Sequence, residues 1–437
     1  MTEPRRRRGD YDPRPSAVAG TAERLPWPAL LTMAVAVFVV VSGEMMPTAV
    51  LPQLAAGLDV SLARAGLLVS AWALTVVVAS FPLVRVTAGL PRPVVIAGAL
   101  VVAALATVVT ASTSEYTVAL GSRLLAAAAT GLLWSTINAH TASIVPSGQI
   151  GRATAVVLFG GTLGTVAGIP AGNAIAQWIG WRAPFLLLAG LTLLAAVAVA
   201  VVLRHYPARA EQESAGTSAG ADAPTSGAGA PIARSRPGLG PVLVTAVLGG
   251  SLLIGHFTAF TFVTELLAPS TVPTAVLLLL FGLVGAAGVL LAGAGSDRYP
   301  AAVPIVLAGT LTLSLWGLML IGRSGIADLG LVLVWGVAVG GLGPAIQARM
   351  MRQAGVRHRT TAGTLMPVAM NLGIAAGSAL GSGVLERASL DGLAPVAIVP
   401  TLLALLGFTV LGRAGRRGAD RADRLIHKRP THPAKIR

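Results

Sequence analysis

Long apolar runs without a charged residue limit this chain more than any other feature. Residues 93–111 and 183–203 are two such runs, and a helix needs about 20 apolar residues to cross a bilayer. Charged residues make up only 11% of the chain and hydrophobic residues 54%, whereas a soluble domain carries about 25% charged residues. The chain therefore cannot cover an ordinary soluble surface, and the sequence predicts an all-α membrane protein.

Apolar runs, read against turn and charge signals, predict twelve transmembrane helices. They are expected at 27–50, 64–86, 93–112, 116–141, 152–173, 182–203, 240–266, 273–295, 302–322, 327–348, 361–385 and 393–413.

A break in this pattern divides the chain into two six-helix halves. Residues 204–238 are rich in Gly, Ala, Ser and Pro and have no apolar period, which is typical of a flexible linker. We expect a basic N-terminal tail, two halves, a linker between them and a basic C-terminal tail, at 1–26, 27–203, 204–238, 239–413 and 414–437.

The distribution of positive charge orients the predicted helices. If both tails and the linker share one side, that side carries 27 of the 32 Lys and Arg residues, and the other side carries four, with Arg123 inside a helix. Cytoplasmic loops carry such an excess, so we expect both termini and the linker in the cytoplasm. The same distribution explains the net charge of +15 without a nucleic-acid partner.

An internal duplication supports two related halves. Leu163-Gly164, Gly168 and Gly172 recur as Leu372-Gly373, Gly377 and Gly381, always 209 residues later. A spacing of four places these glycines on one helix face, where small residues let two helices approach closely. We interpret the faces as tight packing that also serves as a sliding interface. Two repeated six-helix halves are the architecture of the major facilitator superfamily.

Two ionisable residues inside predicted helices are candidates for proton coupling, because such residues are costly in a membrane. Glu44 follows sixteen uncharged residues in the first helix, and burial favours its protonated form, so it can load and release protons. Arg123, in the fourth helix, is expected at a similar depth. A structural ion pair between the two is the alternative.

Five further polar or aromatic residues are candidates for lining a substrate cavity, although each also fits a packing role. His256 lies near the middle of the seventh predicted helix, where a structural histidine is the alternative to a proton relay. The candidates are Trp134, Asn138, His256, Trp335 and Asn371.

Enzyme chemistry has no visible basis in this sequence. There are no cysteines, and the motifs GxxxxGK[ST] and HExxH do not occur. We therefore expect no catalytic residues, no metal site and no cofactor.

Several motifs resemble one known family. Gly43-Glu44-Met45, Gly255-His256-Phe257-Thr258 and Asn371-Leu372-Gly373 resemble those of the twelve-span drug:proton antiporters of the major facilitator superfamily, in the subgroup of sugar-efflux, purine-efflux and chloramphenicol-resistance exporters. The resemblance implies a gating and packing role for one group of residues: Gly164, Gly168, Pro170, Gly172, Asp297, Arg298, Gly373, Gly377 and Gly381.

Two positions depart from that family pattern. The loop Arg85 to Arg92 lacks the acidic residue of the usual gating motif, which only the second half keeps as Asp297-Arg298. Thr130 stands before Gly131 where close relatives often carry histidine. Arg123 matches the fourth-helix arginine that the family associates with proton coupling.

These features predict a multi-pass inner-membrane protein, expected to be a monomer, that exports a small molecule in exchange for protons. The resemblance favours an antibiotic such as chloramphenicol. Sugar or nucleoside export is the nearest alternative, and a membrane receptor that binds without transport is the alternative from another class.

Overall fold

The computed structural model describes residues 25–146, 149–207, 239–354 and 359–427. Most of the predicted tail at 1–26 (residues 1–24), most of the predicted linker (208–238) and the last residues, 428–437, lie outside the described residues. Every regular element in the described ranges is helical. Twelve of the helical segments are long and apolar enough to cross a membrane, which confirms the predicted all-α membrane fold with twelve candidate spans.

The first half contains six spans and one short extra helix. Its elements are α1 (Trp27–Ala49), α2 (Leu51–Gly57), α3 (Leu62–Val86), α4 (Arg92–Ser112), α5 (Tyr116–Ser143), α6 (Ile150–Leu163), the π-helical segment η2 (Gly164–Gly168), α7 (Ile169–Ile179), α8 (Arg182–Val202) and the 3-10 turn η3 (Leu203–His205).

The second half repeats this order after the linker. Its elements are α10 (Leu239–Phe260), α11 (Val263–Leu267), α12 (Thr274–Arg298), α13 (Ala302–Gly317), η4 (Leu318–Leu320), α14 (Gly325–Ala354), α15 (Arg359–Arg387), η5 (Leu390–Gly392) and α16 (Leu393–His427).

Local sequence explains many of the helix ends. The Ser61 side chain accepts a hydrogen bond from the Arg64 amide at 3.1 Å and caps α3. Proline at the first or second helical position begins α1, α4 and α7. Gly180 ends α7 with φ of 91°, a conformation that residues with a Cβ rarely adopt.

Several predicted helices differ in detail from the observed ones. The fifth span was expected to end at 173, but its helix continues through the π-helical segment to Ile179. The seventh is split into α10 and α11. The twelfth span ends at Arg413 as expected, while its helix continues to His427.

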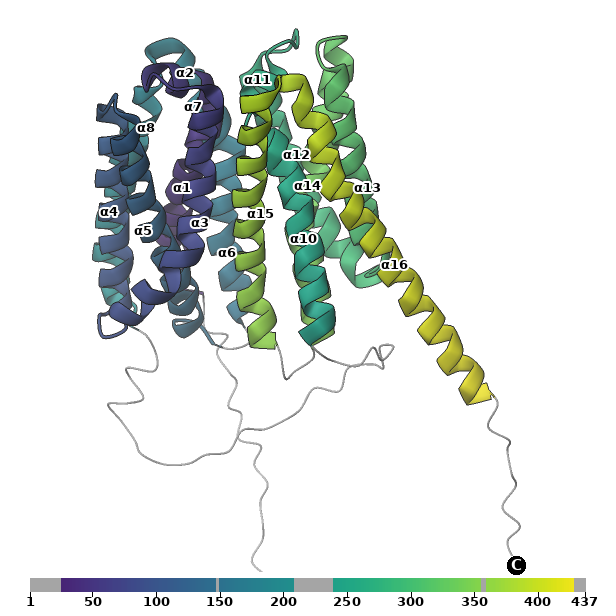
Figure 1. The fold of residues 1–437 in the computed structure, drawn as a ribbon. Coiled ribbons are helices and arrows are strands. Elements are labelled where there is room, and N and C mark those ends of the chain that lie inside the picture. The colour runs from purple at the N-terminus through teal and green to yellow at the C-terminus, as the bar shows by residue number, and fades with distance from the viewer. Residues whose placement is uncertain (1–24, 147–148, 208–238, 355–358, 428–437) are drawn as a thin grey trace, which may run out of the picture.

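The two halves lie side by side, and both described chain ends lie at the same end of the molecule (Figure 1). The short helices α2 and α11 lie at the opposite end (Figure 1). Contacts between the halves run through α3 with α15, through α12 with η2 and α7, and through α11 with α1 and α2. At the α2 end, Ser378 donates a hydrogen bond to the Gly66 carbonyl oxygen at 2.9 Å, and both groups are buried.

The predicted glycine faces pack against the first helix of each half. A Cβ on Gly164, Gly168 or Gly172 would meet α1 at Phe38, Ser42 or Met46 respectively. In the second half, a Cβ on Gly373, Gly377 or Gly381 would meet α10 at Gly250, Ile254 or Thr258. Each glycine face therefore lies close to the first helix of its own half.

Candidate coupling and substrate site

The first helix carries Glu44 in a stretch whose main chain is altered by a proline. Pro47 lies inside α1, three residues after Glu44. Proline has no backbone N–H, so the carbonyl oxygen four residues earlier loses its helical donor. That carbonyl belongs to Gly43, which is buried. The sequence thus creates a free buried acceptor directly beside the candidate coupling residue.

Arg123 fills this free acceptor position. Its Nη1 donates to the Gly43 carbonyl oxygen at 2.9 Å, and its Nη2 donates to the Glu44 carbonyl oxygen at 3.2 Å. Its guanidinium carbon lies 4.0 Å from the centre of the Trp72 ring, a cation–π arrangement. The side chain is 1% exposed, so the charge is held by main-chain dipoles and an aromatic face.

The matched depth predicted for Glu44 and Arg123 agrees with this geometry, but their contact differs from the side-chain ion pair considered above. In the described structure, the hydrogen bonds of Arg123 go to main-chain oxygens of α1. The Glu44 side chain is partly buried, and its carboxylate is not one of these acceptors.

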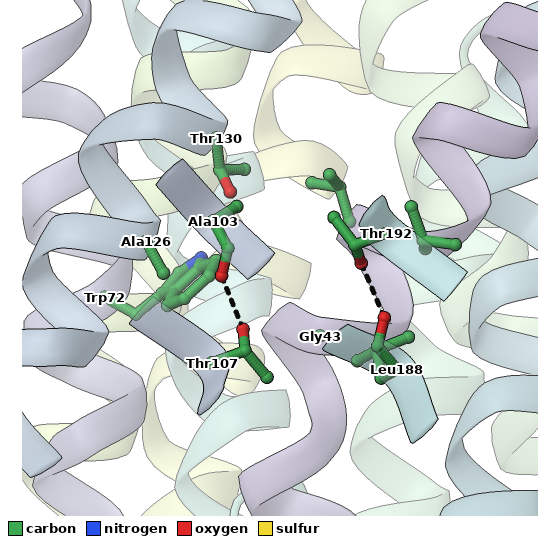
Figure 2. Close-up of a pocket in the computed structure, with 10 residues that line it drawn as sticks. Gly43, Trp72, Ala103, Thr107, Ala126, Thr130, Leu188 and Thr192 are labelled. Carbon is green, nitrogen blue, oxygen red and sulfur yellow. Dashed lines mark hydrogen bonds between the residues drawn. The ribbon is translucent and has the colours of Figure 1, made fainter. Parts of the chain in front are cut away.

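A small pocket lies inside the first half next to these residues. It has a volume of about 10 Å³, close to that needed for a single water molecule. Figure 2 shows Trp72 and Ala126 on one side of it, and Leu188 and Thr192 on the other. The indole nitrogen of Trp72 and the hydroxyl of Thr130 are buried without a partner among the described protein atoms. The pocket is therefore polar enough to hold an ordered water.

The packing of the two halves shows which residue corresponds to Glu44. The glycine contacts match Phe38 with Gly250 and Ser42 with Ile254, a shift of 212 residues (250 minus 38, 254 minus 42). The same shift carries Gly43 to Gly255 and Glu44 to His256. A Cβ on Gly43 would meet Leu188 of α8, and one on Gly255 would meet Ala397 of α16. Glu44 and His256 thus occupy equivalent places in the two halves.

His256 lies in a cluster of aromatic rings. Its ring centre is 4.8 Å from that of Phe260 and 5.5 Å from that of Trp335, and its ring is stacked at 6.4 Å with that of Phe281. His256 is 2% exposed and Trp335 is fully buried. The His256 Nδ1 and the Trp335 Nε1 have no partner among the described protein atoms. The second half therefore holds aromatic surface with two unpaired polar atoms.

The other three cavity candidates lie apart from that cluster. Trp134 packs against the core of the first half near Gly161. Asn138 is exposed on α5. Asn371 is partly exposed and donates to the Pro367 carbonyl oxygen within its own helix at 3.0 Å. The structure brings together only His256 and Trp335 of the five.

The predicted gating residues occupy two kinds of place. Pro170 is buried at the start of α7, directly after the π-helical segment that contains Gly164 and Gly168. Arg298 is exposed at the end of α12, with its guanidinium 5.5 Å from the Tyr299 ring centre. The side chain of Asp297 lies outside the described residues.

Trp72 and Pro47 are site residues that the sequence analysis missed. The spacing of Pro47 from Gly43 follows directly from the helical hydrogen-bond rule, so it was available as a signal. No sequence pattern indicated that Trp72 would lie on Arg123, because the two come from different helices.

Comparison with known proteins identifies the class. Residues 33–378 match the family model of the Major Facilitator Superfamily. The chain therefore belongs to the major facilitator superfamily, as the motifs suggested.

Three named relatives show which members of the superfamily this chain resembles. A chloramphenicol resistance protein of Streptomyces lividans is 35% identical over 365 residues, which cover 81% of this chain and 88% of the relative. A chloramphenicol efflux pump of Mycobacterium tuberculosis is 30% identical over 414 residues, or 91% of this chain and 96% of the relative. An inner membrane transport protein of Escherichia coli is 29% identical, over 87% of this chain and 95% of the relative.

Solved structures confirm the fold. A bacterial homologue of the human lysosomal transporter Spinster, in an inward-facing and unoccupied conformation, matches with a TM-score of 0.71 at 16% identity, over 90% of this chain and 99% of that one. The nucleoside transporter NupG matches with a TM-score of 0.68 at 12% identity, over 88% and 99%. The family match and the twelve candidate spans make the protein a multi-pass membrane transporter of this superfamily.

Proposed function

We propose that this transporter exports a small, mostly uncharged compound in exchange for protons, with Glu44 as the proton-binding group. We place the protein in the bacterial plasma membrane, as a monomer, with both tails and the linker in the cytoplasm. In that orientation the α2 and α11 end faces outward, and the two six-helix halves, 27–203 and 239–413, rock against each other.

The way Arg123 is held carries this proposal. Its charge is compensated by the Gly43 and Glu44 carbonyl oxygens and by the Trp72 ring. A carboxylate that formed a full ion pair with Arg123 would resist protonation. Because main-chain oxygens take that place, Glu44 can accept a proton without leaving the arginine unpaired.

The second half supports the nature of the substrate. The cluster of His256, Phe260, Phe281 and Trp335 is aromatic and holds two unpaired polar nitrogens. An uncharged aromatic compound with polar groups fits such a surface, since ring pairs and buried hydrogen bonds both contribute. Chloramphenicol has this chemistry, and two relatives are named for chloramphenicol. We therefore propose amphenicol antibiotics as the substrate class.

In the proposed cycle, a proton from outside binds Glu44 as substrate leaves outward, and the proton is released to the cytoplasm when the halves return. The close contacts at the glycine faces are proposed to form interfaces along which helices shift: Gly164, Gly168, Gly172, Gly373, Gly377 and Gly381. Pro170 and the Asp297-Arg298 pair are proposed to act in gating. Trp134, Asn138 and Asn371 are proposed to line the path that opens between the halves.

Drug accumulation tests this function. The chain is expressed in a chloramphenicol-sensitive bacterium, and labelled chloramphenicol is measured in cells with and without a protonophore. We expect low accumulation that rises to the level of cells lacking the protein when the protonophore is added. Equal accumulation for chloramphenicol, a sugar and a nucleoside in cells with and without the protein would contradict export.

Two substitutions of glutamate residues separate proton coupling from export. We expect Glu44→Gln to abolish proton-dependent efflux, because glutamine cannot bind the coupling proton. Glu115→Gln is the matched control, since Glu115 is exposed where α5 begins, and it should keep wild-type efflux. Full proton-dependent efflux by Glu44→Gln would show that the coupling group lies elsewhere.

A further inference from the structure

A surface groove is separate from the coupling site, and two of its lining residues, Leu74 and Leu372, are exposed. It has a volume of about 510 Å³, within the range of small-ligand sites. It is formed by α3 and α5 of the first half and by α15 of the second half. Its larger lining residues are Leu67, Ser70, Leu74, Tyr116, Leu120 and Leu372.

Small side chains create this recess. Ala71 on α3 and Ala375, Ala376 and Ala379 on α15 end at Cβ, so the helices leave space where larger residues would fill the seam. The lining is otherwise made of leucines, apart from one serine and one tyrosine. The groove lies along three candidate membrane spans, so a bound molecule must be apolar along most of its length.

One end of the groove carries a positive charge. The guanidinium carbon of Arg64 lies 4.7 Å from the centre of the Tyr116 ring, and the Tyr116 hydroxyl donates to the Arg64 carbonyl oxygen at 2.9 Å. Arg64 is exposed, in the first turn of α3. An apolar groove with a cation at its membrane-surface end matches a molecule with an apolar chain and an anionic head.

We propose that this groove binds a glycerophospholipid, with one acyl chain along the alanine recess and the phosphate at Arg64. The lipid comes from the leaflet that borders α2. The recess lies next to the contact in which Ser378 donates to the Gly66 carbonyl oxygen, since the adjacent residues Leu67 and Ala379 line it. A lipid held against both α3 and α15 stabilises the contact between the halves that these two helices form.

Photolabelling of the purified full-length protein in nanodiscs tests the site. The probe is phosphatidylglycerol with a diazirine at the end of one acyl chain. We expect peptides containing residues 67–74 and 372–379 to be labelled. Label spread evenly over all membrane-facing helices would overturn the proposal.

Filling the groove should remove the label. We expect Ala376→Trp to lower labelling of these peptides about tenfold, the change that corresponds to about 1.4 kcal/mol of binding. Leu403→Trp, at an exposed position of α16, is the matched control and should leave labelling unchanged. Ala379→Phe is a second variant that fills the groove, for use if the first does not fold. Unchanged labelling in both groove variants would contradict the site.

The headgroup contact has its own test. We expect Arg64→Gln to lower labelling of these peptides about fivefold, because one cation near the membrane surface is lost. Arg323→Gln changes an exposed arginine in the η4–α14 connection and should have no effect. Equal labelling by Arg64→Gln and wild type would overturn the phosphate assignment. Competition by chloramphenicol instead of by unlabelled phospholipid would show that the groove belongs to the substrate.

Discussion

The two halves of this transporter pack their helices in the same way, but they differ in the side chains around one pair of equivalent positions, Glu44 and His256. In the first half, the position after a tightly packed glycine is Glu44, beside a buried arginine held by main-chain oxygens. In the second half, the equivalent position is His256, surrounded by Phe260, Phe281 and Trp335.

A single backbone difference accompanies this change of chemistry. Pro47 in α1 removes the helical donor of the Gly43 carbonyl, whereas the corresponding residue of α10 is Ala259, which keeps its N–H. Of these two equivalent helices, only α1 therefore leaves the carbonyl at this position free for a cation. The comparison indicates that duplication preserved helix packing, while local substitutions made one centre charged and the other aromatic.

Among the substitutions that test this difference between the halves, removing the Arg123 cation is expected to have the largest effect on efflux. We expect Arg123→Met to abolish coupled efflux, because two charge-assisted hydrogen bonds are lost at about 1.5–3 kcal/mol each. Drug accumulation with and without a protonophore measures the loss. Arg123→Lys keeps the charge but cannot reach both carbonyls as a planar fork, so it should retain a fraction of the activity. Full activity in Arg123→Met would show that the charged centre is not required.

If the glycine contacts are equivalent in the two halves, a larger side chain at either contact should lower the stability of the fold by a similar amount. We expect Gly168→Val and Gly377→Val each to destabilise the fold by about 1–3 kcal/mol, because a Cβ would meet Ser42 or Ile254. Thermal unfolding in detergent measures the change. Gly98→Val is the control, since a Cβ there meets no atom within 4 Å. A large effect in only one half would break the proposed equivalence.

Restoring a backbone N–H at position 47 should weaken the hydrogen bond from Arg123 to the Gly43 carbonyl oxygen. We expect Pro47→Ala to let residue 47 donate to the Gly43 carbonyl and compete with Arg123, lowering coupled efflux about fivefold, which corresponds to a net hydrogen bond of about 1 kcal/mol. The measurement is the initial rate of protonophore-sensitive export. Pro82→Ala, which changes the proline inside α3, should leave that rate unchanged. A wild-type rate in Pro47→Ala would remove Pro47 from the account.

Changing the aromatic centre should alter selectivity more than coupling. We expect His256→Phe to keep protonophore-sensitive export but to change the relative export of chloramphenicol and a less polar analogue by a few-fold, since one buried hydrogen bond is worth about 1 kcal/mol. Competition for labelled chloramphenicol export measures the ratio. Complete loss of proton dependence in a folded His256→Phe protein would give His256 the role assigned to Glu44.

Much of the fold followed from local patterns. The candidate spans were predictable because each needs its own long apolar run, and the glycine faces because their spacing matches the helical period. The split of the seventh predicted span and the π-helical segment at Gly164–Gly168 were not predicted. Both depend on how neighbouring helices pack, which no local pattern records.

The sequence alone determined that this chain spans a membrane and that its halves are related, since apolar length and repeated spacing are properties of the chain itself. It also singled out Glu44, Arg123 and His256. Only the tertiary structure decided that Arg123 is held by α1 main-chain oxygens over Trp72, and that His256 occupies the place of Glu44. The physical reason is that these relations join separate helices, whose relative register is set by packing and not by sequence separation.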